Sequence, residues 1–343
     1  MTLAPERPGR FRAATLVVGV VVLGLLFWLS LEVNFLFTPV NPGGQVSFVV
    51  PSGATARDIA QILHEAGLIK SPVLFRLIAK YHGLDGRLKA GDYQLEAGLT
   101  MSEIVRRLEE GQVKTIAFTV PEGLTVVQVA ELLEQKGLVS KSEFLEAARD
   151  LSLVEEFLPA GVQLGEPLEG YLFPETYHVG PDASAPEIVR LMLDTLKSHI
   201  SADVSGKMAE MGYSLHEVLT LASIIEKEAV IDDERAIISG VYHNRLRINM
   251  KLDADPTVLY AHGRTHGSLT YKDLDIESAY NTYRVSGLPP GPIASPGWKS
   301  IQAALYPAEV DYFYFVARDD SSHVFSRTLA EHNANVRRYQ SSR

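Results

Sequence analysis

The sequence predicts an α+β protein with a single N-terminal transmembrane helix, a small α/β region and a larger mixed α+β domain. Three observations predict this class. An uncharged apolar run lies at 13–31, directly after a basic N-terminus. Segments with helical periodicity then alternate with short apolar runs that are typical of strands. The length of 343 residues suggests two or three domains.

The composition excludes several classes of function. The net charge of -10 argues against a nucleic-acid-binding protein, which needs a basic surface. The chain has no Cys, which excludes disulfides and thiolate chemistry.

The apolar run at 13–31 is long enough to cross a bilayer. Arg7, Arg10 and Arg12 precede it, and such a basic flank favours a cytoplasmic N-terminus. No small-residue cleavage motif follows. We therefore predict an uncleaved signal anchor within residues 1–38, a single pass through the plasma (inner) membrane, and an extracytoplasmic remainder. The alternative, a buried core helix, fits poorly with so long a run beside a basic terminus.

Two passages of the chain resemble each other. Residues 50–55 and 120–125 share the pattern V-P-x-G-x-T, and each leads into an amphipathic helical pattern that ends at Gly67 or Gly137. A shorter echo begins at 98. Each unit predicts a strand, a tight turn, a helix capped by Thr and a glycine stop. We assign residues 45–115 to one region and place a second repeat at about 116–150, at the start of a domain spanning 116–343.

The stretch from Ser214 predicts the central helix of this domain, because Ser214 and Glu217 form an S-x-x-E capping box. Glu226 falls in the middle of the apolar face, and Glu228 lies about 200° further round. A carboxylate in an apolar stripe must be paired or protonated. Protonation would suit Glu226 to acid catalysis, whereas the alternative is an ion pair with Arg235 or Arg245.

The segment 168–177, L-E-G-Y-L-F-P-E-T-Y, is dense in aromatic and acidic residues and could form a cleft wall. For Tyr171, Phe173 and Tyr177 we favour packing in the core. Helices are predicted at 186–200 and from about Asp233 to 246, the second capped by Asp232 or Asp233.

The C-terminal part contains a stiff Pro/Gly loop at 287–297. With Tyr280, Asn281 and Tyr283 beside it, this loop suits a sugar or forms a structural corner. Asp255-Pro256 should begin a helix. Asp253 and Asp255 lack the oxygen series of a cation site, so no metal site is predicted. A short helix from 295, a buried strand at 311–317, a return strand at 323–326 and a final helix capped by Thr328 complete the chain.

Seven of these segments together resemble the endolytic murein transglycosylase (YceG-like) family. They are LEGYLFPETY, LASIIEKEA, VYHNRL, DADPTV, AYNTY, GLPPGPIASPG and YFYFVA. The resemblance implies an anchor, a LysM-like region at 45–115 and a YceG-like catalytic domain at 116–343 that faces the cell wall.

The resemblance also implies an activity without a cofactor: cleavage of the β-1,4 bond between MurNAc and GlcNAc within nascent peptidoglycan strands, which leaves 1,6-anhydro-MurNAc ends and ends elongation. The partners it implies are glycan strands and peptidoglycan synthases. The first Glu of E-K-E, Glu226, would be catalytic, and Glu175 stands where the family commonly has Asp. The candidate substrate-binding residues are Glu169, Tyr177, Asn244, Asp255, Asn281, Tyr283 and Pro290.

One carboxyl group can suffice for such cleavage, because the substrate's own C6 hydroxyl attacks C1 and no water needs activation. Ordinary glycosidases pair two carboxylates. Two alternatives stay open: a muramidase that uses Glu169 as its second carboxylate, and a non-enzymatic wall-binding scaffold, which the repeats favour. The LysM-like region itself would either bind glycan or act as a spacer.

Overall fold

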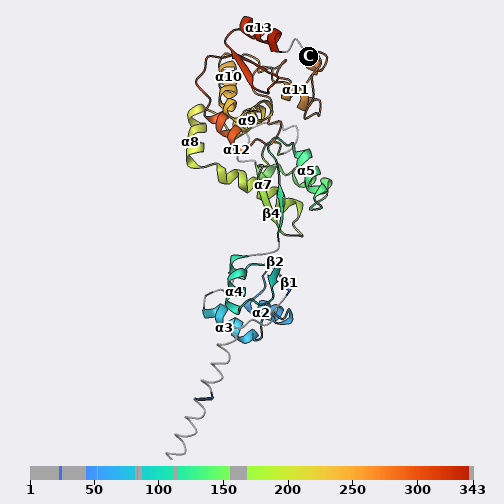
Figure 1. Cartoon of the computed structure of the whole chain (residues 1–343), viewed down its shortest axis with the longest axis vertical. Coiled ribbons are helices and arrows are strands. Elements are labelled where there is room, and N and C mark those ends of the chain that lie inside the picture. Colours follow the sequence, from blue (N-terminus) through green and yellow to red (C-terminus); the bar gives the residue numbers. More distant parts are fainter. Residues whose placement is uncertain are drawn as a thin grey trace, which may run out of the picture. The chain divides into compact units, whose positions relative to one another are not determined.

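The computed structural model describes residues 23–24, 44–51, 53–81, 83, 87–111, 115–154 and 168–339 (Figure 1). The predicted anchor at 1–38 lies outside these residues except for Leu23 and Gly24. Among the described residues, no helix is both long enough and apolar enough to cross a membrane. The chain divides into two compact units, with the boundary between Ile116 and Ala117.

Between residues 44 and 111, the described part of the first unit has an antiparallel pair of strands and three helices. Strands β1 (Gln45–Val50) and β2 (Gly91–Glu96) pair so that Phe48 lies opposite Tyr93, and their rings stack with centroids 5.4 Å apart. Helices α2 (Ala56–Glu65) and α3 (Pro72–Tyr81) connect the strands, and α4 (Met101–Glu110) follows β2. Thr55 and Thr100 cap α2 and α4, as predicted, and the structure shows that each cap is a full capping box.

The second unit begins with the same order of elements. Strand β3 (Ile116–Thr119), helices α5 (Val126–Gln135) and α6 (Lys141–Ala147), strand β4 (Thr176–Val179) and helix α7 (Ala185–His199) follow one another, and β3 pairs with β4. The caps match closely: Thr55 and Thr125 both have φ -78° and ψ 162°, and Gly67 and Gly137 both have φ 69°. The repeat in the sequence is therefore also a repeat in local structure.

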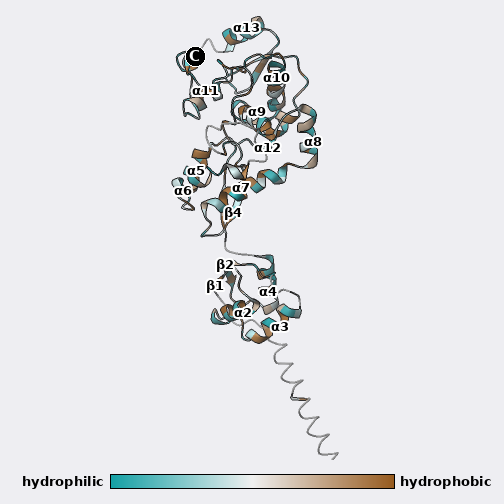
Figure 2. Cartoon of the chain, turned by 180° about the vertical axis from the view of Figure 1, so that it is seen from behind, coloured by the Kyte–Doolittle hydropathy of each residue, from teal (hydrophilic) through white to brown (hydrophobic). Residues whose placement is uncertain are grey.

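The remainder of the second unit surrounds helix α9 (Leu215–Glu228), which begins at the predicted Ser214 capping box. Most of α9 is buried, and it packs against α10 (Arg235–Arg247), α11 (Asp255–Ala261) and α12 (Trp298–Leu305). The other elements are α8 (Ala202–Met211), β5 (Tyr314–Ala317), β6 (His323–Ser326), α13 (Leu329–Tyr339) and the short 3₁₀ turns Leu151–Leu153, Asp232–Glu234 and Asp273–Asp275. Figure 2 shows hydrophilic and hydrophobic stretches mixed along these helices, and their buried apolar residues form one core cluster.

The mixed α+β class is confirmed, since helices dominate and each sheet of the described chain has two strands. Two details of the prediction are wrong. Helix α10 starts at Arg235 without a side-chain cap, because Asp232 lies in a 3₁₀ turn and binds Arg235 and Lys299. The strand predicted at 311–317 begins at Tyr314, and only Val316 in it is buried. The β5–β6 hairpin and the Thr328 cap of α13 are confirmed.

Candidate active site

Helix α9 carries Glu226 on a side that is filled with hydrogen-bond donors. Its Oε2 accepts bonds from the backbone N of Gly297 (3.0 Å) and from Oγ of Ser300 (2.8 Å), and its Oε1 lies 3.3 Å from Nη1 of Arg235. The side chains of Glu226 and Arg235 are only 8% and 10% exposed. The ion pair with Arg235, predicted as the alternative, is therefore present, and it ties α9 to α10 and to the start of α12.

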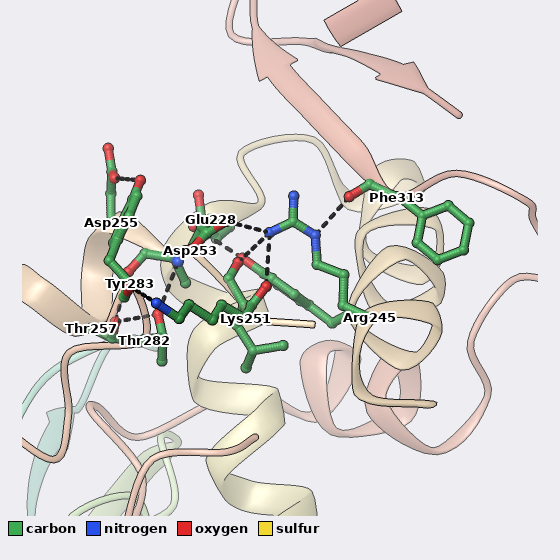
Figure 3. Close-up of polar contacts among 12 residues, drawn as sticks. Glu228, Arg245, Lys251, Asp253, Asp255, Thr257, Thr282, Tyr283 and Phe313 are labelled. Atoms are coloured by element: carbon green, nitrogen blue, oxygen red, sulfur yellow. Dashed lines mark hydrogen bonds and ion pairs between the residues drawn. The ribbon is translucent and has the colours of Figure 1, made fainter. Parts of the chain in front are cut away.

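Glu228, the last residue of α9, instead lines a cavity of about 380 Å³. Four other polar residues of this lining are Arg245, Asp253, Asp255 and Tyr283, and Figure 3 shows them grouped around the end of α9. The β5–β6 hairpin and α13 close the cavity with Tyr314, Phe315, Val316, Ala317, His323, Leu329, His332 and Val336. Sequence reasoning missed Glu228, although one signal was available. A negative charge in the last turn of a helix interacts unfavourably with the helix dipole, so a carboxylate at this position indicates a role other than stabilising the helix.

The environment of Glu228 favours its neutral form. Burial raises the pKa of this carboxyl to about 7, and the nearby charge of Asp255 acts in the same direction. The hydroxyl of Tyr242, which donates to Oε1 at 3.1 Å, and the charge of Arg245 partly oppose this rise. A carboxyl group in this state can donate a proton near neutral pH and take one back.

Asp255 and Tyr283 form a second polar pair in the same cavity. The Tyr283 hydroxyl donates to Oδ1 of Asp255 at 2.6 Å (Figure 3). Burial, together with the charge of Asp255, raises the pKa of Tyr283, which keeps this donor protonated. Asp255 itself is exposed at the start of α11. Both residues were predicted to bind substrate, and the structure brings them together with Glu228.

Asn281 lies behind this pair and supports it. It is fully buried, and its Nδ2 donates to the carbonyls of Leu274 (2.8 Å) and Ile276 (2.9 Å). Its Oδ1 accepts from the backbone N of Tyr283 at 3.0 Å. The predicted substrate-binding role of Asn281 does not fit this geometry, because these bonds engage both ends of its amide. Asn281 positions Tyr283.

Asn244 and Arg245 hold the chain that precedes β5. Nδ2 of Asn244 donates to the carbonyls of Val310 (2.8 Å) and Tyr312 (2.9 Å), so this residue supports the scaffold, and its predicted contact with substrate stays a prediction. Nε of Arg245 donates to the carbonyl of Phe313 at 2.6 Å (Figure 3). Its Nη1 donates to the carbonyl of Leu252 at 2.7 Å. Arg245 thereby fixes two walls of the cavity.

Two other predicted contacts are also structural. Tyr177 is 3% exposed and its hydroxyl donates to the carbonyl of Phe173 at 2.5 Å, so it lies in the core, as the packing interpretation expected. The carbonyl of Pro290 accepts a bond from Nε2 of His216 at 2.7 Å. The Pro/Gly loop is a structural corner, since Ser295 exchanges backbone bonds with the 123–124 turn.

Glu169 belongs to a different cavity. Its side chain is buried, Oε1 accepts from the backbone N of Val126 at 3.0 Å, and Oε2 accepts from the hydroxyl of Tyr260 at 3.3 Å. This second cavity, of about 570 Å³, does not include Glu228 in its lining. Within the described residues, no group of three or more His, Cys, Asp or Glu is arranged to hold a metal ion.

Comparisons with known proteins agree on one family. The model of the YceG-like family matches residues 48–338. A protein named endolytic murein transglycosylase from Bacillus subtilis (strain 168) is 38% identical over 310 residues, which covers 87% of this chain and 86% of that protein. Proteins of the same name from two strains of Streptococcus pneumoniae are 29% identical over 331 residues, which covers 88% of this chain and 60% of theirs.

A solved structure supports the same relationship. The crystal structure of a yceG-like protein from Listeria monocytogenes is 37% identical in sequence and superimposes with a TM-score of 0.59, covering 84% of this chain and 98% of that one. Since the family model and these relatives extend over most of the chain, this protein is a member of the YceG-like family.

Proposed function

We propose that this protein is an endolytic murein transglycosylase that cleaves the β-1,4 bond between MurNAc and GlcNAc within peptidoglycan strands, with Glu228 as its catalytic acid and base. The observation that carries the proposal is the cavity in which Glu228, with a pKa of about 7, lies beside Asp255 and Tyr283. The reaction class is supported by the relatives that bear this name at 38% and 29% identity.

The chemistry follows from one carboxyl group that changes its protonation state. Neutral Glu228 donates its proton to the glycosidic oxygen as the C1–O bond breaks. The resulting carboxylate then removes the proton of the C6 hydroxyl as that oxygen attacks C1 and closes the 1,6-anhydro ring. Glu228 ends the cycle neutral, and no water is consumed. A pKa close to the working pH serves both steps.

The remaining groups of the cavity have supporting roles. Tyr242 holds Oε1 of Glu228 and so directs the proton on the carboxyl. Asp255, oriented by Tyr283, supplies a negative charge near the sugar, where positive charge develops at C1 in the transition state. Arg245 and Asn244 keep the hairpin wall in place.

A hydrolase of the same bond is the second candidate function. Asp255 gives the cavity a second carboxylate beside Glu228, which a muramidase requires. Glu169, the second carboxylate expected from sequence, lies in the other cavity and does not fit this role. A third candidate, a scaffold that only binds the wall, would leave the strands intact.

Incubation of the purified protein with uncrosslinked glycan strands distinguishes these functions. Mass spectrometry should find product ends that lack one water relative to reducing ends. Hydrolysed ends would establish a muramidase, and uncut strands would establish a scaffold. Because Glu228 must start protonated, kcat/KM should fall as the pH rises above about 7.

We also propose that residues 1–38 anchor the protein in the plasma membrane with the catalytic unit outside, near the peptidoglycan synthases. The support is the apolar run at 13–31 with its basic flank. Protease added outside spheroplasts should digest the catalytic unit, and full protection there would refute the topology.

We further propose that the LysM-like region at 45–115 binds glycan.

A further inference from the structure

We propose that the second cavity of the catalytic unit is a distal subsite for the same glycan strand, which holds a neutral sugar residue close to the bond that is cut. This inference rests on the proposed function, because the sugar that it places in the second cavity belongs to the peptidoglycan strand that Glu228 would cut. The cavity measures about 570 Å³ and lies between α5, the end of α11 and the residues around 265 and 278–280. Figure 1 shows α5 and α11 on the same side of the unit.

Two elements connect this cavity to the one that contains Glu228. Helix α11 carries Asp255 in the first cavity and Tyr260 in the second, and five residues of helix rise by about 8 Å. The segment 278–283 makes the same connection, because Ser278 and Tyr280 line the second cavity and Tyr283 lines the first. The two cavities are therefore neighbours, at a separation that one or two sugar rings can bridge.

The walls of the second cavity have the composition that a sugar requires. The rings of Tyr260 and Tyr280 lie with centroids 4.9 Å apart at an angle of 51°, and both are partly buried, so they offer fixed apolar surfaces. Gln128, whose Nε2 donates to Oγ1 of Thr265 at 3.3 Å, and Ser278 add hydroxyl and amide groups. A saccharide presents apolar ring faces together with hydroxyls and matches both kinds of wall.

Two of the three charged residues that line this cavity form ion pairs within the protein. Glu131 pairs with Lys141 at 2.7 Å, and Arg264 lies 3.7 Å from Asp273. Glu169 is buried beneath Tyr260 and accepts its hydroxyl. A neutral ligand therefore suits the site better than a phosphate or a charged stem peptide, because an ionic ligand would have to compete with these pairs.

An occupied distal subsite has a consequence for the reaction. Binding energy from a remote sugar can be used at the reacting centre, so long strands should be cut more efficiently than short ones. A sugar held in the second cavity also means that the cut bond cannot be the terminal bond on that side of the strand. The subsite thus provides a physical reason for cutting inside a strand.

The test compares Tyr280→Ala with the parent protein, using the full-length chain. The substrates are long peptide-free glycan strands and the shortest oligosaccharide that the parent cuts. We expect the ratio of kcat/KM on long strands to kcat/KM on the short substrate to fall about tenfold, the effect of losing one stacked ring. Tyr280→Phe should preserve this ratio because it keeps the ring. Tyr271→Ala, at a tyrosine that is 92% exposed and outside the cavity, is the matched control and should also preserve it.

A binding measurement separates the failure of the subsite from the failure of the proposed function. Calorimetric titration of a peptide-free oligosaccharide onto Glu228→Gln should show affinity about tenfold higher than onto Glu228→Gln combined with Tyr280→Ala. Ala261→Trp, which places a large side chain in the cavity, should cause the same loss of affinity. Because this variant keeps Tyr280, the result does not depend on whether Tyr280→Ala folds correctly. Equal affinities and an unchanged ratio would overturn the subsite. If the parent cuts no glycan of any length, the proposed function fails while the titration still decides the subsite.

Discussion

Replacing Glu228 by Gln should remove activity and at the same time stabilise the protein at high pH. The carboxyl has a pKa of about 7 in the folded chain, against an ordinary value of 4.5. Between these values the folded state binds the proton more tightly than the unfolded state, so the free energy of unfolding falls as the pH rises. Above pH 7 the ionisation of Glu228 lowers the free energy of unfolding by about 3 kcal/mol in total, at about 1.4 kcal/mol per pH unit.

Glutamine cannot ionise and therefore does not incur this cost, while its amide oxygen can still accept the bond from Tyr242. We expect Glu228→Gln to exceed the parent in stability by about 3 kcal/mol at pH 8 and to equal it near pH 4. The measurement is urea unfolding of both proteins across this range, followed by a probe within the catalytic unit. Cleavage of uncrosslinked strands by the same preparations should fall by at least about 10²-fold.

Glu226→Gln is the matched control on the same helix. Removing this charge leaves Arg235 without its buried carboxylate partner, so we expect a loss of about 3 kcal/mol at pH 8. The folded fraction of this variant should still cut glycan. A Glu228→Gln protein that cuts at the parent rate, or whose advantage in stability does not depend on pH, would refute the assignment. A folded but inactive Glu226→Gln protein would return the catalytic role to Glu226.

Three further predictions follow from the geometry. Gly240→Ala should lose about 1–3 kcal/mol of stability, because the new Cβ would lie 2.5 Å from the carbonyl oxygen of Ala308. Gly206→Ala, which meets nothing within 4 Å in helix α8, should instead gain up to about 1 kcal/mol, and chemical denaturation of the pair checks both signs. Tyr283→Phe should lower kcat/KM about tenfold by removing the donor to Asp255, and activity at the parent level would show that this pair is not used. Deleting residues 45–115 should weaken the binding of long glycan to the Glu228→Gln protein if the LysM-like region binds the wall. Equal affinity with and without these residues would show that the region acts only as a spacer.

The sequence alone determined the features that depend on neighbouring residues. Helix starts at Thr55, Thr125 and Ser214 were predictable because a capping side chain bonds to a backbone group three residues away. The repeat followed from the same local signals, and so did the hairpin near the C-terminus. The helical wheel also showed correctly that Glu226 and Glu228 project to different sides of one helix.

Only the tertiary structure decided which of these two carboxyl groups lines a cavity and which is bonded within the scaffold. The donors around Glu226 come from Gly297 and Ser300, about 70 residues away, and the walls around Glu228 come from α11 and the β5–β6 hairpin. Asn244 and Asn281 were recognised as important but assigned to substrate, because the carbonyls that they bind are brought to them only by folding. A polar side chain in a motif can serve the scaffold or the ligand equally well, and the choice depends on which groups the rest of the chain places within hydrogen-bond reach.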